Sequence, residues 1–312
     1  MPIEFVSFQS EQWRLNGCVH VPEREPEQRI GILLVHENTK FGTHGLFKRL
    51  ADTLAASGFY VLRFDNRGTC DSPGDCEFAF QGRVEDACAA ANFFTAECKL
   101  DHLLLWGLCM GAAVAVHCSS ILNGESRLGG LILCSLLADP VDASLPEFDY
   151  KPVTVSAYVR NGMLNGGPWK RLRSFVSDSG YRANVLRSIG ALAQRHSGVG
   201  SKFKEVRNQI GRVGPLLARY PGPSLLVYGE TDPYWSAFTQ RINANDKLRL
   251  SKMKTPPKLV VVSEGDHMFN SVDTTAQVIQ LSVSWAEAFR EGKAPTSHPE
   301  ELYAFFAAST AN

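Results

Sequence analysis

The stretch Leu103–Ser120, LLLWGLCMGAAVAVHCSS, joins an apolar run to a run of small residues through two glycines that flank a cysteine. The apolar run predicts a buried strand, and the pattern over Met110–Ile121 predicts a helix. Cys109 stands at the turn between them, in the pattern Gly-x-Cys-x-Gly. A sharp turn needs neighbours without bulky side chains, and Gly107 and Gly111 meet that need. Cys109 is therefore a candidate nucleophile; the alternative interpretation is a buried structural cysteine.

The same turn is placed to stabilise negative charge. The helix that begins at Met110 points its N-terminus at the turn, and the positive end of a helix favours a thiolate and an oxyanion. The backbone N–H of Met110 is one predicted oxyanion-hole donor. The second is expected after the apolar run Ile30–His36, at the N–H of Glu37 or Asn38. The Glu37 carboxylate has two open interpretations: a group that accepts or holds the thiol proton, and an ordinary loop acid.

Strand-like and helix-like stretches alternate along the chain. Repeated strand–helix units predict an α/β fold with a mostly parallel central sheet and helices on both faces. An antiparallel hairpin is expected at the start, over residues 5–10 and 13–20. The further expected strands are Ile30–His36, Tyr60–Asp65, Leu103–Trp106, Gly130–Ser135, Ser224–Tyr228 and Lys258–Ser263, and the expected helices are Leu46–Ser57, Val84–Cys98, Met110–Ile121 and Thr274–Glu291.

The alternation breaks over residues 140–221, which are expected to form an inserted helical cap. The core is then formed by residues 1–139 and 222–312. Between Tyr150 and Gly214, twelve basic residues stand against two acidic ones, although the whole chain has zero formal net charge. Two interpretations stay open. The segment is a solvated helical face, or it meets an anionic substrate such as coenzyme A or an acyl carrier protein.

The partners of the nucleophile are expected after later strands, in the order nucleophile, acid, base. Asp232 follows the strand-like run that ends at Tyr228 and is the favoured acid, with Glu230 as a nearby competitor. His267 follows the last strand-like run and is the expected base. Because parallel strands end at one edge of a sheet, the nucleophile, acid and base are expected to meet there. Three further residues are expected to contact substrate: His36, His44 and Trp169.

Composition narrows the class of protein. The eight cysteines show no paired spacing and no C-x-x-C motif, which predicts reduced thiols, a cytoplasmic protein and no zinc site. The neutral net charge does not favour nucleic acid as a partner. No stretch approaches the ~20 apolar residues of a membrane-spanning helix. No metal or organic cofactor is predicted.

Two motifs resemble those of a known family. The stretches LLVHENTKFG, at residues 33–42, and GLCMGA, at residues 107–112, together are similar to the dienelactone hydrolases of the α/β-hydrolase superfamily. The resemblance implies the α/β-hydrolase fold, a triad of Cys109, Asp232 and His267, and a contact of Glu37 with the thiol. Dienelactone hydrolases are shorter than this chain and lack a segment like residues 140–221.

A second resemblance spans roughly residues 30–290. The stretches YVLRFDNRGTCDSPG, LLLWGLCMGAA, YGETDPYWSAF and EGDHMF resemble, in order, motifs of the α/β hydrolases associated with bacterial exosortase systems, which also carry a cysteine at the sharp turn. Cys70 departs from that pattern, because a small residue is usual there. Polyhydroxyalkanoate synthases, which are acyltransferases, look similar around the cysteine alone.

Three functions are compatible with these features. The first is a hydrolase that cleaves an ester, thioester or lactone carbonyl through an acyl-cysteine intermediate, with a small-molecule or carrier-bound acyl substrate. The second is an acyltransferase or condensing enzyme that passes the acyl group to an amine, thiol or carbon acceptor. The third is a non-catalytic binding protein on a hydrolase scaffold.

Overall fold

The computed structural model describes residues 2–36, 45–74, 80–122, 127–137, 199–235 and 253–297. The chain forms two compact units, Met1–Asp139 with Gln209–Asn312, and Pro140–Asn208. Helix α7 (Val199–Leu217) contributes residues to both units and carries Pro215 within it. The predicted cap over residues 140–221 lies for the most part outside the described residues.

An eight-stranded sheet is the centre of the first unit, with the strand order β1-β2-β4-β3-β5-β6-β7-β8. The pairs β1–β2 and β2–β4 are antiparallel, and every later neighbour pair is parallel. The predicted hairpin and mostly parallel sheet are thus confirmed. The strands are β1 (Ile3–Ser10), β2 (Trp13–His20), β3 (Ile30–Val35), β4 (Tyr60–Phe64), β5 (His102–Leu108), β6 (Leu128–Cys134), β7 (Ser224–Gly229) and β8 (Lys258–Val262).

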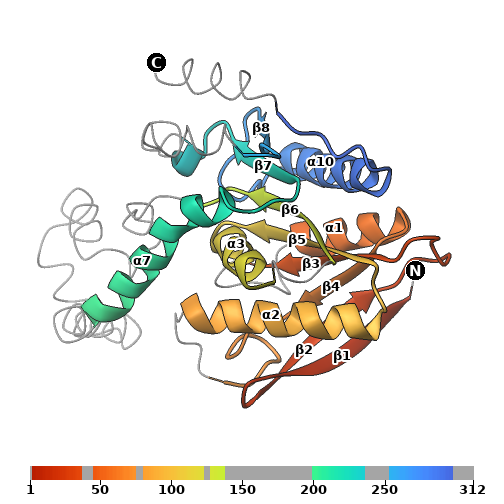
Figure 1. The fold of residues 1–312 in the computed structure, drawn as a ribbon, viewed down its shortest axis with the longest axis horizontal. Helices are drawn as coiled ribbons and strands as arrows, with labels where there is room; N and C mark the ends of the chain where they lie inside the picture. The colour runs from red at the N-terminus through yellow and green to blue at the C-terminus, as the bar shows by residue number, and fades with distance from the viewer. Residues whose placement is uncertain are drawn as a thin grey trace, which may run out of the picture. The chain divides into compact units, whose positions relative to one another are not determined.

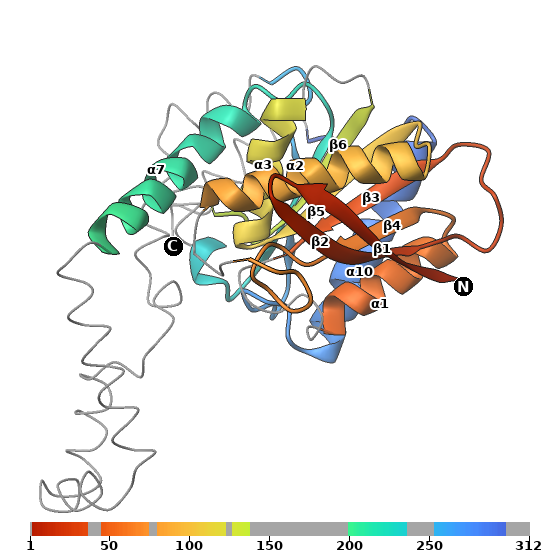
Figure 2. The ribbon, with the colours of Figure 1, turned by 90° about the horizontal axis from the view of Figure 1, so that it is seen from below.

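Helices cover both faces of this sheet (Figures 1 and 2). Helices α1 (Gly45–Ala56) and α10 (Val272–Arg290) lie together on one face, and α2 (Phe80–Glu97) and α3 (Met110–Leu122) lie side by side on the other. All six residues of β3 are buried, as expected for a strand covered on both faces. A buried hydrogen bond of 2.9 Å from the Trp106 indole N–H to the Ser282 hydroxyl joins β5 to α10.

The observed elements agree with the predicted ones within a few residues at each end. The largest difference is at α2, which begins at Phe80 instead of Val84. The polar residues before Val84 interrupt the helical spacing of apolar residues, so the sequence does not indicate this first turn. In the structure, Phe80 is buried and makes an edge-on contact with the His117 ring, 4.9 Å between centroids. Strand β5 continues to Leu108 because the chain turns only at Cys109.

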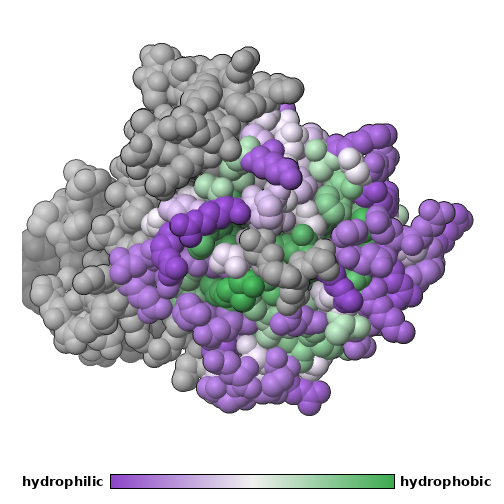
Figure 3. All heavy atoms as spheres, viewed as in Figure 1, coloured by the Kyte–Doolittle hydropathy of each residue, from purple (hydrophilic) through white to green (hydrophobic). Residues whose placement is uncertain are grey.

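The face seen in Figure 1 is mostly hydrophilic at its rim. Figure 3 shows apolar side chains gathered near its middle, over the region of α3, and Ile121 near the end of that helix is 61% exposed. Among the helices that the structure describes, none combines the length and the apolar character that crossing a lipid bilayer requires.

Candidate active site

The turn at Cys109 has the strained geometry that its sequence predicts. Cys109 is half-buried and has a φ of 55°, in the left-handed region that non-glycine residues rarely adopt. A Cβ at Gly107 would lie 2.6 Å from the Cα of Ala112, and one at Gly111 would meet the carbonyl oxygens of Val35 and His36. Both glycines are therefore required by close backbone approach, which brings the start of α3 against the end of β3.

The start of α3 leaves backbone donors near the sulfur. The carbonyl oxygen of Cys109 accepts from the N–H groups of Ala112 and Ala113, at 3.1 and 3.3 Å, so the helix begins directly after the cysteine. Met110 is the first helical residue, and an N–H at that position has no partner within its own helix. It is thus available to an oxyanion formed at the cysteine.

His267 and Asp232 are in direct contact. The imidazole Nδ1 of His267 lies 3.0 Å from Oδ1 of Asp232, and the same oxygen accepts a hydrogen bond of 2.9 Å from the backbone N–H of Tyr234. The Tyr234 ring packs on the imidazole with centroids 4.5 Å apart. Asp232 is buried, so its oxygen is held where it fixes the proton on Nδ1 and leaves Nε2 for a second partner.

That second partner is Cys109. Burial alone lowers the pKa of His267, but the charge of the Cys109 thiolate and hydrogen bonds to Asp232 and Cys109 outweigh it, so the pKa is raised to about 11. The raised pKa means that the imidazolium form of His267 is stabilised at this position. The three residues expected from the sequence are therefore brought together, although they follow three different strands, β5, β7 and β8, and are separated by up to 158 positions.

The end of β6 connects the backbones of the cysteine and the histidine. The N–H of Cys109 donates to the carbonyl oxygen of Cys134, at 2.9 Å. The next residue, Ser135, donates its hydroxyl to the carbonyl oxygen of His267, at 2.8 Å, and its N–H to Val227, at 2.7 Å. Ser135 is fully buried and has a φ of 48°. This connection holds the three strand ends in register.

Strained backbone gathers around this edge of the sheet. Among the described non-glycine residues with positive φ are Cys109, Ser135, Glu264 and Phe269, with φ between 48° and 55°. Cys109, Ser135 and Glu264 lie within two residues of the carboxyl ends of β5, β6 and β8, and Phe269 lies two residues after His267. Strain of this kind persists only where surrounding contacts enforce it, and it is common at active sites.

His36 follows β3 and is almost fully buried. Its Nε2 lies 3.1 Å from the side-chain amide of Asn66, and its ring packs edge-on against Phe47 and Phe64. These contacts fix the last residue before the loop that was predicted to supply an oxyanion donor. They support a role in holding that loop, whereas the predicted contact of His36 with substrate stays a prediction. The other residues expected near substrate or oxyanion lie outside the described residues: Glu37, Asn38, His44 and Trp169.

Glu230, the competing acid, lies elsewhere. Its carboxylate is exposed and accepts from the Ser263 hydroxyl and the Glu264 N–H, at 2.9 and 3.0 Å. These two hydrogen bonds lower the pKa of Glu230. The geometry thus pairs His267 with Asp232, while Glu230 secures the turn after β8.

Sequence reasoning missed three supporting residues: Asn66, Ser135 and Tyr234. Ser135 had a usable signal, because it follows a buried strand at the edge where the other candidates lie. Asn66 likewise follows β4. Nothing in the local pattern around Tyr234 indicates that its ring packs on the imidazole.

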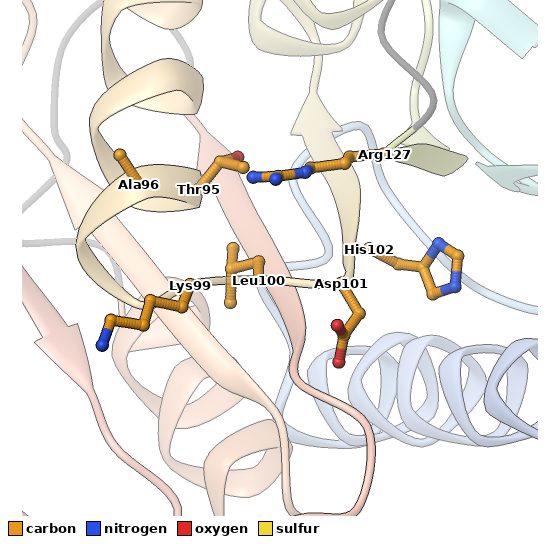
Figure 4. A pocket seen from close by; sticks show the side chains of 7 residues that line it. All are labelled: Thr95, Ala96, Lys99, Leu100, Asp101, His102 and Arg127. Carbon is orange, nitrogen blue, oxygen red and sulfur yellow. The ribbon is translucent and has the colours of Figure 1, made fainter.

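A polar hollow of about 590 Å³ lies at the opposite edge of the sheet. It is lined by residues that include Thr95, Lys99, His102 and Arg127, and Figure 4 shows Arg127 extending towards Thr95 while Lys99 points away. His102 begins the strand that ends beside Cys109, so the hollow is separated from the sulfur by the length of β5, roughly 20 Å. In the described parts of the chain, no cluster of three or more His, Cys, Asp or Glu side chains is placed to hold a metal ion.

This fold, with a nucleophile-like turn after β5, an acid after β7 and a histidine after β8, defines a class of proteins. The chain belongs to the alpha/beta hydrolase family, whose model matches residues 32–281. A comparison with the curated proteins gave no match.

Solved structures of the same fold are similar over nearly the whole chain. Est1E from Butyrivibrio proteoclasticus has a TM-score of 0.58 at 14% identity, covering 92% of this chain and 99% of that one. The alpha/beta hydrolase GrgF from a Penicillium species has a TM-score of 0.58 at 18% identity, covering 94% and 99%. A dienelactone hydrolase from Anabaena variabilis has a TM-score of 0.54 at 13% identity, covering 92% and 97%. These likenesses establish the fold, and the family model places the chain among the alpha/beta hydrolases.

Proposed function

We propose that this hydrolase uses Cys109 to cleave an ester, thioester or lactone carbonyl through an acyl-cysteine intermediate. The observation that carries the proposal is the chain of contacts from Asp232 through His267 to Cys109, at a strained turn. A similar order of nucleophile, acid and base is the general arrangement of α/β hydrolases. The dienelactone hydrolase among the structures of the same fold supports chemistry at an acyl carbon.

In this mechanism, Asp232 holds the His267 imidazole so that Nε2 takes the proton from the Cys109 thiol. The sulfur attacks the carbonyl carbon, and the Met110 N–H stabilises the oxyanion, with the Glu37 or Asn38 N–H as the predicted second donor. Such a donor is worth about 3 kcal/mol of the barrier. The imidazolium then protonates the leaving group. Water, deprotonated by His267, cleaves the thioester and restores the thiol.

An acyltransferase is the second candidate, and the sulfur nucleophile favours it. A thioester intermediate is open to amines, thiols and carbon nucleophiles as well as to water. The two functions share every step up to the intermediate and differ in the acceptor. Adding an amine or thiol during turnover separates them, because an acyltransferase diverts product to the acceptor.

The test is intact-protein mass spectrometry after incubation with a panel of p-nitrophenyl esters and acyl thioesters. The wild-type chain should gain the acyl mass, and Cys109→Ala should not. Cys70→Ala is the matched control, because Cys70 is an exposed thiol that also has a positive φ, and it should keep the adduct. Cys109→Ser should lose most activity, since a hydroxyl gains less from the imidazolium. A folded wild-type chain that gains no adduct would favour a non-catalytic binding protein.

A further inference from the structure

Two cysteine sulfur atoms lie close together away from the candidate active site. Sγ of Cys88 and Sγ of Cys118 are 3.2 Å apart, in a contact between α2 and α3. Among the seven cysteines that the structure describes, none forms a disulfide. We propose that Cys88 and Cys118 form a reversible disulfide when the protein meets a peroxide, and that this bond fastens α2 to the helix that follows Cys109.

The packing of the two helices explains why the sulfurs meet. Helix α2 has the run Ala87–Ala91, ACAAA, and the first turn of α3 contains Gly111, Ala112 and Ala113. Small residues let two helix axes approach closely, so that short side chains from both reach one another. Figures 1 and 2 both show α2 and α3 side by side.

The geometry needs little movement for a bond to form. Sulfurs in a disulfide are about 2.05 Å apart, so the two atoms would approach by about 1.2 Å, a distance that side-chain torsions supply. The two cysteines lie 30 positions apart in the sequence, and linking them closes a loop that includes β5 and the turn at Cys109. The chain constrained by the bond therefore contains the candidate nucleophile.

The two thiols differ in access to solvent, which sets the order of steps. Cys88 is half-buried, whereas Cys118 is fully buried. The Cys88 sulfur attacks hydrogen peroxide, breaks its O–O bond and becomes a sulfenic acid, with release of one water. The Cys118 sulfur then attacks the sulfenic sulfur, forms the S–S bond and releases a second water. Each sulfur loses one electron and the peroxide accepts both.

Two other cysteines, Cys98 and Cys134, are less suited to form a disulfide. Cys98 lies just beyond the end of α2, and burial together with Glu97 and Glu4 raises its pKa to about 12, which leaves little thiolate to react. Burial also raises the pKa of Cys134. A close contact between two thiols, one of them open to solvent, therefore selects Cys88 and Cys118.

The experiment uses the full chain, reduced and then treated with hydrogen peroxide, followed by alkylation of the remaining thiols and trypsin digestion. Cys88 and Cys98 share the peptide 84–99, and Cys109 and Cys118 share the peptide 100–127, so variants must assign the link. The oxidised chain should lose about two mass units and join these peptides. The link should persist in Cys98→Ser and in Cys109→Ser, and should vanish in Cys88→Ser and in Cys118→Ala.

A second readout follows the effect on the fold. The oxidised wild-type chain should unfold at a temperature about 5 °C higher than the reduced chain, and dithiothreitol should reverse the rise. Cys88→Ser, which keeps the buried Cys118, should show no rise in unfolding temperature. A link that survives in Cys88→Ser would overturn the proposal, as would oxidation of Cys88 that gives no link. None of these measurements depends on catalysis by Cys109.

Discussion

The hydroxyl of Ser135 donates a hydrogen bond of 2.8 Å to the backbone carbonyl oxygen of His267. The preceding residue, Cys134, accepts from the N–H of Cys109, so two consecutive residues at the end of β6 hold the candidate nucleophile and the candidate base. Two groups that exchange a proton in the proposed mechanism are thus attached to one short, buried and strained segment.

Ser135→Ala tests this connection. The substitution leaves a buried carbonyl without its donor, which costs about 1–3 kcal/mol, and it frees the backbone of His267 to shift. We expect kcat to fall about tenfold with little change in KM. Ser120→Ala is the control, because the Ser120 hydroxyl also donates to a backbone carbonyl, that of His117, but away from the site. Equal kcat values in the two variants would rule out a positioning role for Ser135.

Asp232→Asn and Glu230→Gln distinguish the two acids. Asp232 holds the histidine proton, so its amide should impose the wrong tautomer and lower kcat by about 10²–10⁴. Glu230→Gln should change kcat by less than about threefold, because its carboxylate is exposed and touches only the turn after β8. Steady-state kinetics with the best ester from the panel provide the measurement. A larger loss in Glu230→Gln would reverse the assignment of the acid.

Gly111→Ala should distort the junction between β3 and α3. The new methyl group would overlap the carbonyl oxygens of Val35 and His36, which are backbone atoms and cannot move aside alone. We expect a loss of about 1–3 kcal/mol in the free energy of unfolding, measured by urea denaturation. In Gly45→Ala, no atom beyond the residue's own neighbours lies within 4 Å of the new methyl group, so stability should change by less than about 0.5 kcal/mol. Unchanged stability in Gly111→Ala would mean that the close approach is absent.

The raised pKa of His267 predicts how fast the Cys109 sulfur reacts. His267 stays positively charged at pH 7, and a positive charge beside a cysteine favours attack by its sulfur, so iodoacetamide should alkylate Cys109 rapidly. In His267→Gln this charge is absent, and the rate at pH 7 should fall at least about tenfold. Both chains should carry Cys70→Ala to remove the exposed thiol. Equal alkylation rates in the two chains would show that His267 does not act on Cys109.

His20 predicts a loss of stability in acid. Burial, followed by the neighbouring Arg63, lowers its pKa from 6.5 to about 4, so the folded chain binds fewer protons than the unfolded chain between these values. The contribution of His20 to the free energy of unfolding is therefore present above pH 6.5 and is lost as the pH falls through about 4. Thermal unfolding from pH 7 to 4 should show a smaller decline in His20→Gln than in the wild type.

Asp65 affects the pH dependence of stability in the opposite direction to His20, so the comparison between the two chains must keep it unchanged. Burial raises the pKa of Asp65 from 3.8 to about 6, so its contribution is present below pH 3.8 and is lost as the pH rises through about 6. Both chains keep Asp65, and the difference between them isolates His20. Parallel curves would contradict the prediction.

Much of the fold follows from local pattern. Strands such as β3 and β7 are mostly apolar and are buried along their whole length, so an apolar run of this length identifies them. The turn at Cys109 is also readable, because Gly107 and Gly111 mark backbone contacts that no side chain tolerates. Asp232 and His267 were found from their places after strands, without any knowledge of the distance between them.

Contacts between distant segments could not be read in this way. The bond from Ser135 to His267 spans 132 positions, and the contact of Cys88 with Cys118 depends on how α2 and α3 pack. The start of α2 was misplaced because the burial of Phe80 depends on His117, a residue in another helix. Such details come from tertiary packing, which overrides local preference.

The direct pairing of β6 with β7 has a consequence for how this protein can change. Leu131 aligns with Ser224 and Cys134 with Val227, so the chain leaves the sheet after one strand and re-enters it at the adjacent strand. The hydrogen bonds between β6 and β7 do not involve the residues that lie between these two strands in the sequence. We therefore expect that an engineer is able to exchange residues 140–208, which form a unit of their own, while Cys109, Asp232 and His267 keep their alignment.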